Sequence, residues 1–145
     1  MEVNLRAARE EDIQFLLDLR VLTMESYLEK DGVPCTEEEN LYRIRYNFED
    51  AQIIEIGSKK AGLFKASYLA DKEQWYLFQI QVHPDFQNLR IGSYLINTLI
   101  HKAKQQGKSI GLSVLKSNPA FNLYRKLGFK VVEENEHEFE LLLEA

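Results

Sequence analysis

The segment over residues 83–93 has the residue types and the spacing of a place that binds an anion. A predicted strand ends there, a short loop follows, and Gly92 lies just inside the next predicted helix. The first N–H groups of a helix have no intrahelical partner and carry the positive end of the helix dipole, so they attract a diphosphate. Gly92 lets the backbone come close to such a ligand, and Asn88 and Arg90 add polar and cationic groups at the rim.

A second group of polar residues lies in the segment over residues 118–129. Asn118 precedes a short predicted helix that contains Tyr124 and ends at Gly128. Taken alone, Asn118 is as consistent with a helix N-cap as with a ligand contact. Taken alone, Tyr124 is best explained as a core aromatic residue whose hydroxyl finds a partner.

The composition is that of one ordinary globular domain. The chain has 145 residues, of which 45% are apolar and 28% are charged, and we expect residues 1–145 to form one domain. A single cysteine, Cys35, excludes an internal disulfide framework and fits a reducing cytoplasm. The net charge of −5 argues against a nucleic-acid partner, and no apolar run approaches the roughly 18 residues of a membrane span, so we expect no membrane partner.

The hydrophobic periodicity predicts seven strands and four helices. The helix over residues 13–27 has an apolar stripe, and Thr36 with Glu39 forms a capping-box pattern before a second helix that runs to about residue 48. The other helices are expected over residues 91–105 and 119–127, and the strands over residues 3–7, 52–56, 61–69, 75–82, 109–115, 129–133 and 138–143. The predicted stripe of the first helix consists of Ile13, Leu16, Leu17, Val21, Met24 and Leu28.

The order βααβββαβαββ predicts an α/β (α+β) fold. We expect a mixed, mostly antiparallel sheet with helices on both faces, and a parallel crossover from the strand over residues 75–82 to the strand over residues 109–115.

In this setting the two polar segments resemble the two hallmarks of the GNAT superfamily of N-acetyltransferases. Gln87 and Gly92 match the pattern Gln/Arg-x-x-Gly-x-Gly/Ala, and Val82 and Pro84 match the Val-x-Pro that often ends the strand before it. Arg90 departs from the pattern because it occupies the first glycine position. Residues 118–129 resemble the second hallmark, an Asn followed by a helix that reads Leu-Tyr-x-x-x-Gly-Phe. One helix and one strand separate the two segments, as in the family.

The resemblance implies acetyl-CoA as co-substrate and direct attack of a primary amine, from a small molecule or a peptide, on the thioester. It places Tyr124 as the general acid that protonates the departing thiolate, and Asn118 as a cofactor contact. An acyl-CoA-binding sensor or regulatory domain without turnover is the alternative. The backbone of Ile80, Gln81 and Val82 would pair with the pantetheine arm, and the diphosphate would be held by Gln87, Asn88, Leu89, Arg90, Ile91, Gly92 and Ser93.

The acceptor side is predicted from the first helix, which often borders the acceptor groove in this family. Arg20 lies near the apolar stripe, where it binds an acceptor carboxylate or, alternatively, extends along the margin of the stripe into water. Tyr27, seven residues further on, is the second acceptor-binding candidate. We expect no metal site and a monomer or homodimer.

No general base can be assigned from the sequence. The strands where the family often places a glutamate offer Gln79, Gln81 and Ser113, which are not bases near neutral pH. Glu73 and His83 lie at the ends of the strand over residues 75–82, where a solvated role is expected.

Overall fold

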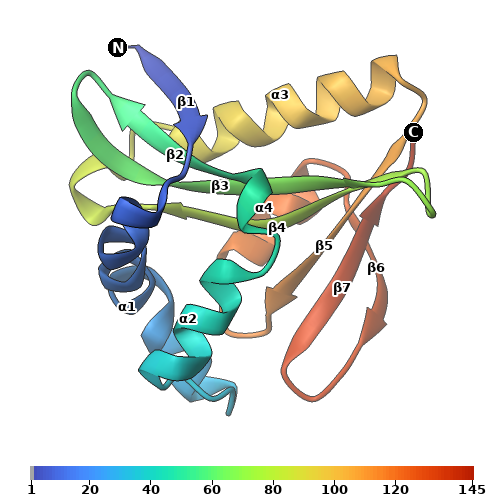
Figure 1. Cartoon of the computed structure of the whole chain (residues 1–145). Coiled ribbons are helices and arrows are strands. Elements are labelled where there is room, and N and C mark those ends of the chain that lie inside the picture. The colour runs from blue at the N-terminus through green and yellow to red at the C-terminus, as the bar shows by residue number, and fades with distance from the viewer. Residues whose placement is uncertain (1) are drawn as a thin grey trace.

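The computed structural model describes residues 2–145 and is built around a seven-stranded sheet with the strand order β1-β2-β3-β4-β5-β7-β6 (Figure 1). Every neighbouring pair of strands is antiparallel except β4 and β5, which run parallel. The predicted mixed sheet and its parallel crossover are confirmed. The strands are β1 (Val3–Ala7), β2 (Ala51–Ile56), β3 (Lys59–Leu69), β4 (Gln74–Val82), β5 (Ser109–Leu115), β6 (Lys130–Glu134) and β7 (Glu138–Leu143).

Helices cover both faces of the sheet, as predicted (Figure 1). α1 (Ile13–Lys30) and α2 (Glu37–Arg45) lie on one face, and α3 (Ile91–Gln105) and α4 (Ala120–Lys126) lie on the other. The observed element order confirms βααβββαβαββ. Three short 3-10 helices, η1 (Glu10–Asp12), η2 (Phe48–Asp50) and η3 (Pro84–Phe86), join these elements. Among residues 2–145, no helix has both the length and the apolar character that crossing a bilayer requires.

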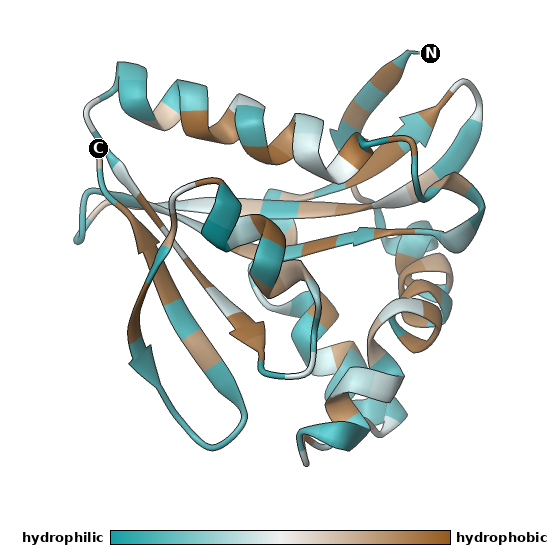
Figure 2. Ribbon diagram, turned by 180° about the vertical axis from the view of Figure 1, so that it is seen from behind, coloured by the Kyte–Doolittle hydropathy of each residue, from teal (hydrophilic) through white to brown (hydrophobic). Residues whose placement is uncertain are grey.

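Each face of the sheet buries its own apolar core. Figure 2 shows a stripe of hydrophobic residues on the side of α3 that faces the sheet and hydrophilic residues on its outer side. This stripe packs with α4 and with β3, β4 and β5 in the larger core. The smaller core under α1 and α2 consists of Leu16, Leu19, Ile44, Ala51, Ile53 and Leu63.

The first two helices differ from the sequence prediction. α1 continues to Lys30 rather than ending near residue 27, and α2 ends at Arg45 rather than near residue 48. α2 stops because Tyr46 has an extended backbone and Asn47 has the left-handed conformation, with φ of 51°. Thr36 caps α2 as predicted, since its hydroxyl accepts a hydrogen bond from the N–H of Glu39 at 3.2 Å.

The predicted stripe of α1 is wrong at Val21, which is 49% exposed. The buried face runs instead through Leu16, Leu19, Arg20 and Leu28. Leu19 and Arg20 follow Leu16 at spacings of three and four residues, so they share its face of the helix, whereas Val21 is turned away. The correction matters for the site, because it moves Arg20 from the margin of the stripe into its centre.

The sheet opens between β4 and β5. The two strands pair only from Gln74 to Leu77 on β4 and from Ser109 to Leu112 on β5. Beyond this point β4 carries a bulge, because Lys65 and Ala66 of β3 oppose Gln79 and Leu77 and leave Phe78 without a partner residue. A bulge bends a strand and increases its local twist. From Phe78 to Val82, β4 therefore has a free edge on the side of β5.

Candidate active site between β4 and β5

A cavity of about 450 Å³ lies where β4 and β5 separate. Its size is within the range of sites for small molecules. α1, α2, β3, β4, β5, α4 and the start of β7 all contribute to its wall. Its aromatic and aliphatic lining residues include Met24, Leu28, Tyr42, Tyr46, Phe78 and Leu115.

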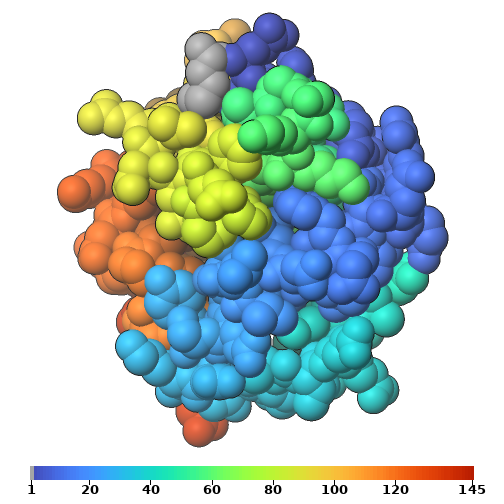
Figure 3. Space-filling view, turned by 90° about the vertical axis from the view of Figure 1, so that its left-hand side faces the viewer, coloured from blue at the N-terminus to red at the C-terminus, as the bar shows by residue number. Residues whose placement is uncertain are grey.

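The start of α3 presents free backbone donors. The N–H of Tyr94 is the first to bond back into the helix, to the carbonyl of Arg90 at 3.0 Å. The N–H groups of residues 90–93 donate to no other residue of the described chain. The loop after β4, α1 and the region of α4 reach one common face of the molecule (Figure 3). The arrangement is suited to an anionic group that approaches from this face.

Two residues of this loop have the left-handed backbone conformation, Asn88 with φ of 68° and Arg90 with φ of 60°. Arg90 is also the N-cap residue of α3 and is exposed. A glycine would adopt this conformation without strain, whereas a residue with a Cβ carries a cost of about 1 kcal/mol. Gln87 closes the loop, because its Nε2 donates to the carbonyl of Val82 at 3.0 Å. Leu89 is 46% exposed beside them.

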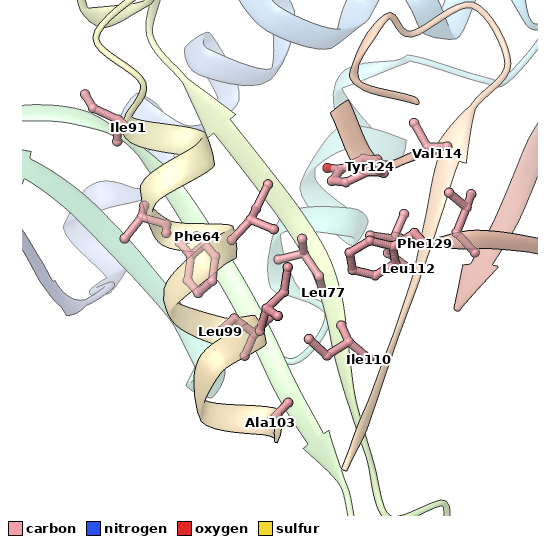
Figure 4. Packing of buried hydrophobic residues seen from close by; sticks show 14 of the residues in the cluster. Phe64, Leu77, Ile91, Leu99, Ala103, Ile110, Leu112, Val114, Tyr124 and Phe129 are labelled. Atoms are coloured by element: carbon pink, nitrogen blue, oxygen red, sulfur yellow. The ribbon is translucent and has the colours of Figure 1, made fainter. Parts of the chain in front are cut away.

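Tyr124 and Asn118 both line the cavity from the far side of the opening. The ring of Tyr124 packs edge-on against Phe129, and its hydroxyl is on the side that faces β4 (Figure 4). Burial raises the pKa of Tyr124 to about 12, so the hydroxyl keeps its proton at neutral pH. Asn118 acts as a cap, since its Oδ1 accepts a hydrogen bond from the N–H of Ala120 at 2.9 Å. Its amide nitrogen is left over for another partner.

Arg20 lies inside the cavity wall rather than at the margin of α1. It is 7% exposed, and its Nε donates to Oδ1 of Asn40 on α2 at 2.9 Å. Asn40 is itself fixed by the carbonyl of Cys35, which accepts from its Nδ2 at 3.4 Å. Tyr27, the other predicted acceptor-binding residue, does not line this cavity. Its backbone carbonyl accepts a hydrogen bond from the hydroxyl of Ser117 at 3.4 Å.

Lys65 is a buried cation that the sequence analysis did not single out. It is 1% exposed, and its Nζ donates to the carbonyls of Arg43, Ile44 and Tyr46 at 2.5 to 3.1 Å. These are the carbonyls at the C-terminal end of α2, where a positive charge is favourable. Burial lowers the pKa of Lys65 to about 8. The visible signal was a lysine in the middle of an otherwise apolar strand.

A hydrogen-bonded group crosses the sheet beside the cavity. The hydroxyl of Tyr76 on β4 contacts the hydroxyl of Ser113 at 2.7 Å and donates to the carboxylate of Glu140 on β7 at 2.8 Å. Burial raises the pKa of Tyr76 far above its usual range, and the Glu140 carboxylate adds to this effect, so the phenol stays protonated. Glu138, two residues before Glu140, lines the cavity itself. Neither glutamate was predicted from the sequence, because β7 comes to lie beside β5 only in the folded sheet.

Glu25, Glu29 and Cys35 bring potential ligand atoms within 4.8 Å of one another near α1. Glu29 is exposed, and acidic groups often gather at a surface without binding an ion. We assign no role to this cluster.

The sequence pattern that describes the acetyltransferase (GNAT) family matches residues 16–129, which include most of the residues that line the cavity, the loop before α3 and both polar segments. The chain belongs to the GNAT family. The resemblance first seen in two short motifs therefore extends over most of the chain.

Individual relatives differ in how much of this GNAT chain they cover. Spermidine N(1)-acetyltransferase from Escherichia coli (strain K12) is 26% identical over 152 aligned positions, which cover 94% of this chain and 77% of the relative. The cysteine-rich protein 2-binding protein from Mus musculus is 40% identical over 58 residues, 40% of this chain, but the match spans only 7% of that protein's length.

The fold is shared with a solved structure, the PaiA N-acetyltransferase from Thermoplasma acidophilum in complex with coenzyme A. The TM-score is 0.74 at 18% identity, and the alignment covers 100% of both chains. At this identity the likeness concerns the fold.

Proposed function

We propose that this GNAT chain is an acetyl-CoA-dependent N-acetyltransferase that moves an acetyl group to a primary amine of a small molecule or a peptide. The observation that carries the proposal is the opening of the sheet. β4 keeps a free edge from Phe78 to Val82, free N–H groups lie at the start of α3, and Tyr124 faces the opening from α4. Family membership and the names of the relatives support the same conclusion.

The residues around the opening fit the parts of acetyl-CoA, which supplies an activated thioester. The N–H groups of residues 90–93 would bind the diphosphate, with the guanidinium of Arg90 at its rim. The backbone of Ile80, Gln81 and Val82 would pair with the pantetheine arm as a strand adds to a sheet edge. Gln87 would hold the loop in shape through Val82, and the free amide nitrogen of Asn118 would be a further contact.

In this proposal Tyr124 acts as the general acid. Its raised pKa of about 12 keeps the hydroxyl protonated, and its position across from β4 directs that proton toward the departing sulfur. The amine attacks the thioester carbonyl, the C–S bond breaks, and the thiolate takes the proton of Tyr124. Glu138 is the carboxylate that lines the cavity, so it is the group to test as the acceptor of the amine proton.

Two measurements in sequence test the proposal. Calorimetry with acetyl-CoA should show binding to the wild-type chain, and a thiol-release assay with a panel of amines should show CoA release above background. Binding without release for any amine would favour the sensor alternative, and absence of binding would contradict both readings.

The site of the chemistry is tested with a matched pair of variants. Tyr124→Phe should lose turnover and keep acetyl-CoA binding, because only the proton donor is removed. Tyr68→Phe removes a hydroxyl from a tyrosine that is 40% exposed. Tyr68 is near the C-terminal end of β3 and does not line the cavity, so this change should leave turnover unchanged.

A cytoplasmic location and a monomeric or homodimeric state remain predictions. The first rests on the single cysteine, Cys35. For the second, β1 and β6 are the edge strands of the sheet and would be available for pairing.

A further inference from the structure

The acceptor side of the cavity contains polar atoms that the protein leaves without partners. The guanidinium of Arg20 lines the cavity, and its hydrogen bond to Asn40 uses only Nε. In the described chain, neither Nη1 nor Nη2 of Arg20 donates to another residue, and no carboxylate lies within ion-pair distance. A guanidinium has its remaining N–H groups in a planar fork that matches a carboxylate. Arg20 is therefore a largely buried residue that lines the cavity and whose Nη1 and Nη2 have no partner in the described chain.

The wall on β4 offers the opposite kind of group. Gln79 and Gln81 both line the cavity, and the Oε1 atom of each is buried without a hydrogen-bond partner in the described chain. Gln81 is only 5% exposed, so water does not readily replace the missing partner. Buried polar atoms are paired in nearly all folded proteins, and those that are not often belong to a ligand site. Rotation of these amides about their Cγ–Cδ bonds would bring the two oxygens to the N–H groups of an amine in the cavity.

The charges of the cavity wall exclude one class of amine. Arg20, Arg43 and Lys65 line it, whereas Glu138 is the one carboxylate among its described lining residues. The chain as a whole carries a net charge of −5, so the cavity is locally opposite in sign to the molecule. A polyamine would bring several positive charges next to a buried, unpaired guanidinium. A carboxylate would instead supply the missing counter-charge.

We propose that the acceptor is a small amino carboxylate, whose carboxylate binds Arg20 and whose amine donates to the side-chain oxygens of Gln79 and Gln81. The proposal rests on the proposed acetyl transfer and names the substrate class of the same site. The amide oxygens bind the amine without a full negative charge, and Arg20 lies nearby as a cation. The cation beside the amine favours its neutral form, which is the nucleophile.

Asn40 has a positioning role in this arrangement. It is 4% exposed and holds Nε of Arg20, while the carbonyl of Cys35 holds Asn40. These contacts fix Nε of Arg20 and leave Nη1 and Nη2 without a partner in the described chain.

Matched substrates test the proposal on the wild-type chain. Each amino carboxylate of a panel, the standard α-amino acids with β-alanine and 4-aminobutyrate, is compared with its amide and its decarboxylated amine. The readouts are thiol release at saturating acetyl-CoA and calorimetric binding in the presence of CoA. At least one amino carboxylate should exceed its two analogues by tenfold or more in kcat/KM and in affinity. Equal or better use of spermidine, of decarboxylated amines or of peptide N-termini would overturn the proposal.

Variants then assign the preference to Arg20. Arg20→Gln should raise KM for the preferred amino carboxylate by 10-fold to 100-fold and change KM for its decarboxylated analogue by less than threefold. Arg20→Lys keeps the charge but not the fork, so it should recover part of the preference. Arg45→Gln is the control, because Arg45 is an exposed arginine of α2 that pairs with Glu10 and does not line the cavity. A preference that survives Arg20→Gln unchanged contradicts the assignment.

The calorimetric arm separates this inference from the proposed function. If acetyl-CoA binds and no compound is acetylated, the proposed activity fails, whereas selective binding of an amino carboxylate would still support the site. If amines without a carboxylate are acetylated as well as those with one, the activity stands and the inference is wrong. If neither compound class binds or reacts, the inference is wrong as well.

Discussion

The two sides of the opening between β4 and β5 are made of different chemical groups. On the side of α3, the free groups are backbone N–H groups of four consecutive residues, 90–93, and the edge of a single strand. On the other side they are side chains from α1, β3, β4 and β7, separated by up to 118 positions, from Arg20 to Glu138. The first kind of site depends on the path of the chain and tolerates changes of side chain. The second depends on several separate residues and changes its specificity whenever one of them is replaced.

The largest effect on catalysis should come from Tyr124, which lines the cavity from α4. In Tyr124→Phe the departing thiolate loses its proton donor, and we expect kcat to fall roughly 10³-fold, in the range of general acid catalysis. Steady-state kinetics with the best amine of the panel measures the loss. Calorimetry should give an unchanged affinity for acetyl-CoA, and a parallel loss of binding would show that the residue is structural instead.

The next effect concerns the stability of the folded chain. Lys65→Met leaves three carbonyls at the end of α2 without their donor, and we expect the free energy of unfolding to fall by about 2–3 kcal/mol at pH 7. Chemical denaturation measures it. Lys59→Met, at the exposed start of the same strand, should change it by less than about 0.5 kcal/mol.

The same lysine predicts a pH dependence. Its pKa is about 8 in the folded chain and 10.5 as the ordinary value, so between these pH values the unfolded chain binds more protons. The free energy of unfolding of the wild type should therefore rise relative to Lys65→Met from pH 8 to about 10.5, and be parallel to it below pH 8. Denaturation curves of both chains across this range measure the difference between their free energies of unfolding. A difference that becomes smaller as the pH rises would contradict the prediction.

A smaller effect is expected where the backbone itself forms the site. A Cβ on Gly62 would clash with the carbonyl oxygen of Gln81 and touch Ile54, so Gly62→Ala must displace β4 along the edge proposed for the pantetheine arm. We expect the affinity for acetyl-CoA to fall about tenfold, as calorimetry would show. Gly107→Ala, in a left-handed turn with no neighbour within 4 Å, is the control. It should cost about 1 kcal/mol of stability and leave the affinity unchanged.

The smallest effect concerns the one side chain that departs from the family pattern. Arg90→Gly relieves the strain of a left-handed arginine, partly offset by the greater freedom of glycine in the unfolded chain, so stability should rise by about 0.5 kcal/mol. Removing the guanidinium should at the same time weaken acetyl-CoA binding a few-fold. Opposite signs in thermal unfolding and calorimetry would identify Arg90 as a diphosphate contact. A gain in both would show that it only strains the loop.

The sequence predicted the elements around residues 80–93 better than the set of residues that meet around the cavity, for a physical reason. Residues 80–93 are contiguous, and a strand, a loop and a helix start follow from local pattern alone. The element order was predictable for the same reason. The roles of Lys65 and Glu138 depend on which elements meet in space, and the bulge at Phe78 has no local signal among its neighbours. Arg20 lay between the two cases. Its place on the helix was predictable. Its burial was not, because it depends on the orientation of α1 against the sheet, in which Leu19 is buried and Val21 is exposed.

The short pairing between β4 and β5 divides the sheet into two leaves. Strands β1 to β4 form one, β5 to β7 form the other, and within the sheet a seam of four residue pairs joins them. The two leaves are hydrogen-bonded to each other at one end only, so a molecule bound in the cavity contacts both of them. Motions that move the leaves apart would break the hydrogen bonds of these four residue pairs. Amide hydrogen exchange at Trp75 and Ile110 would measure how often these bonds open.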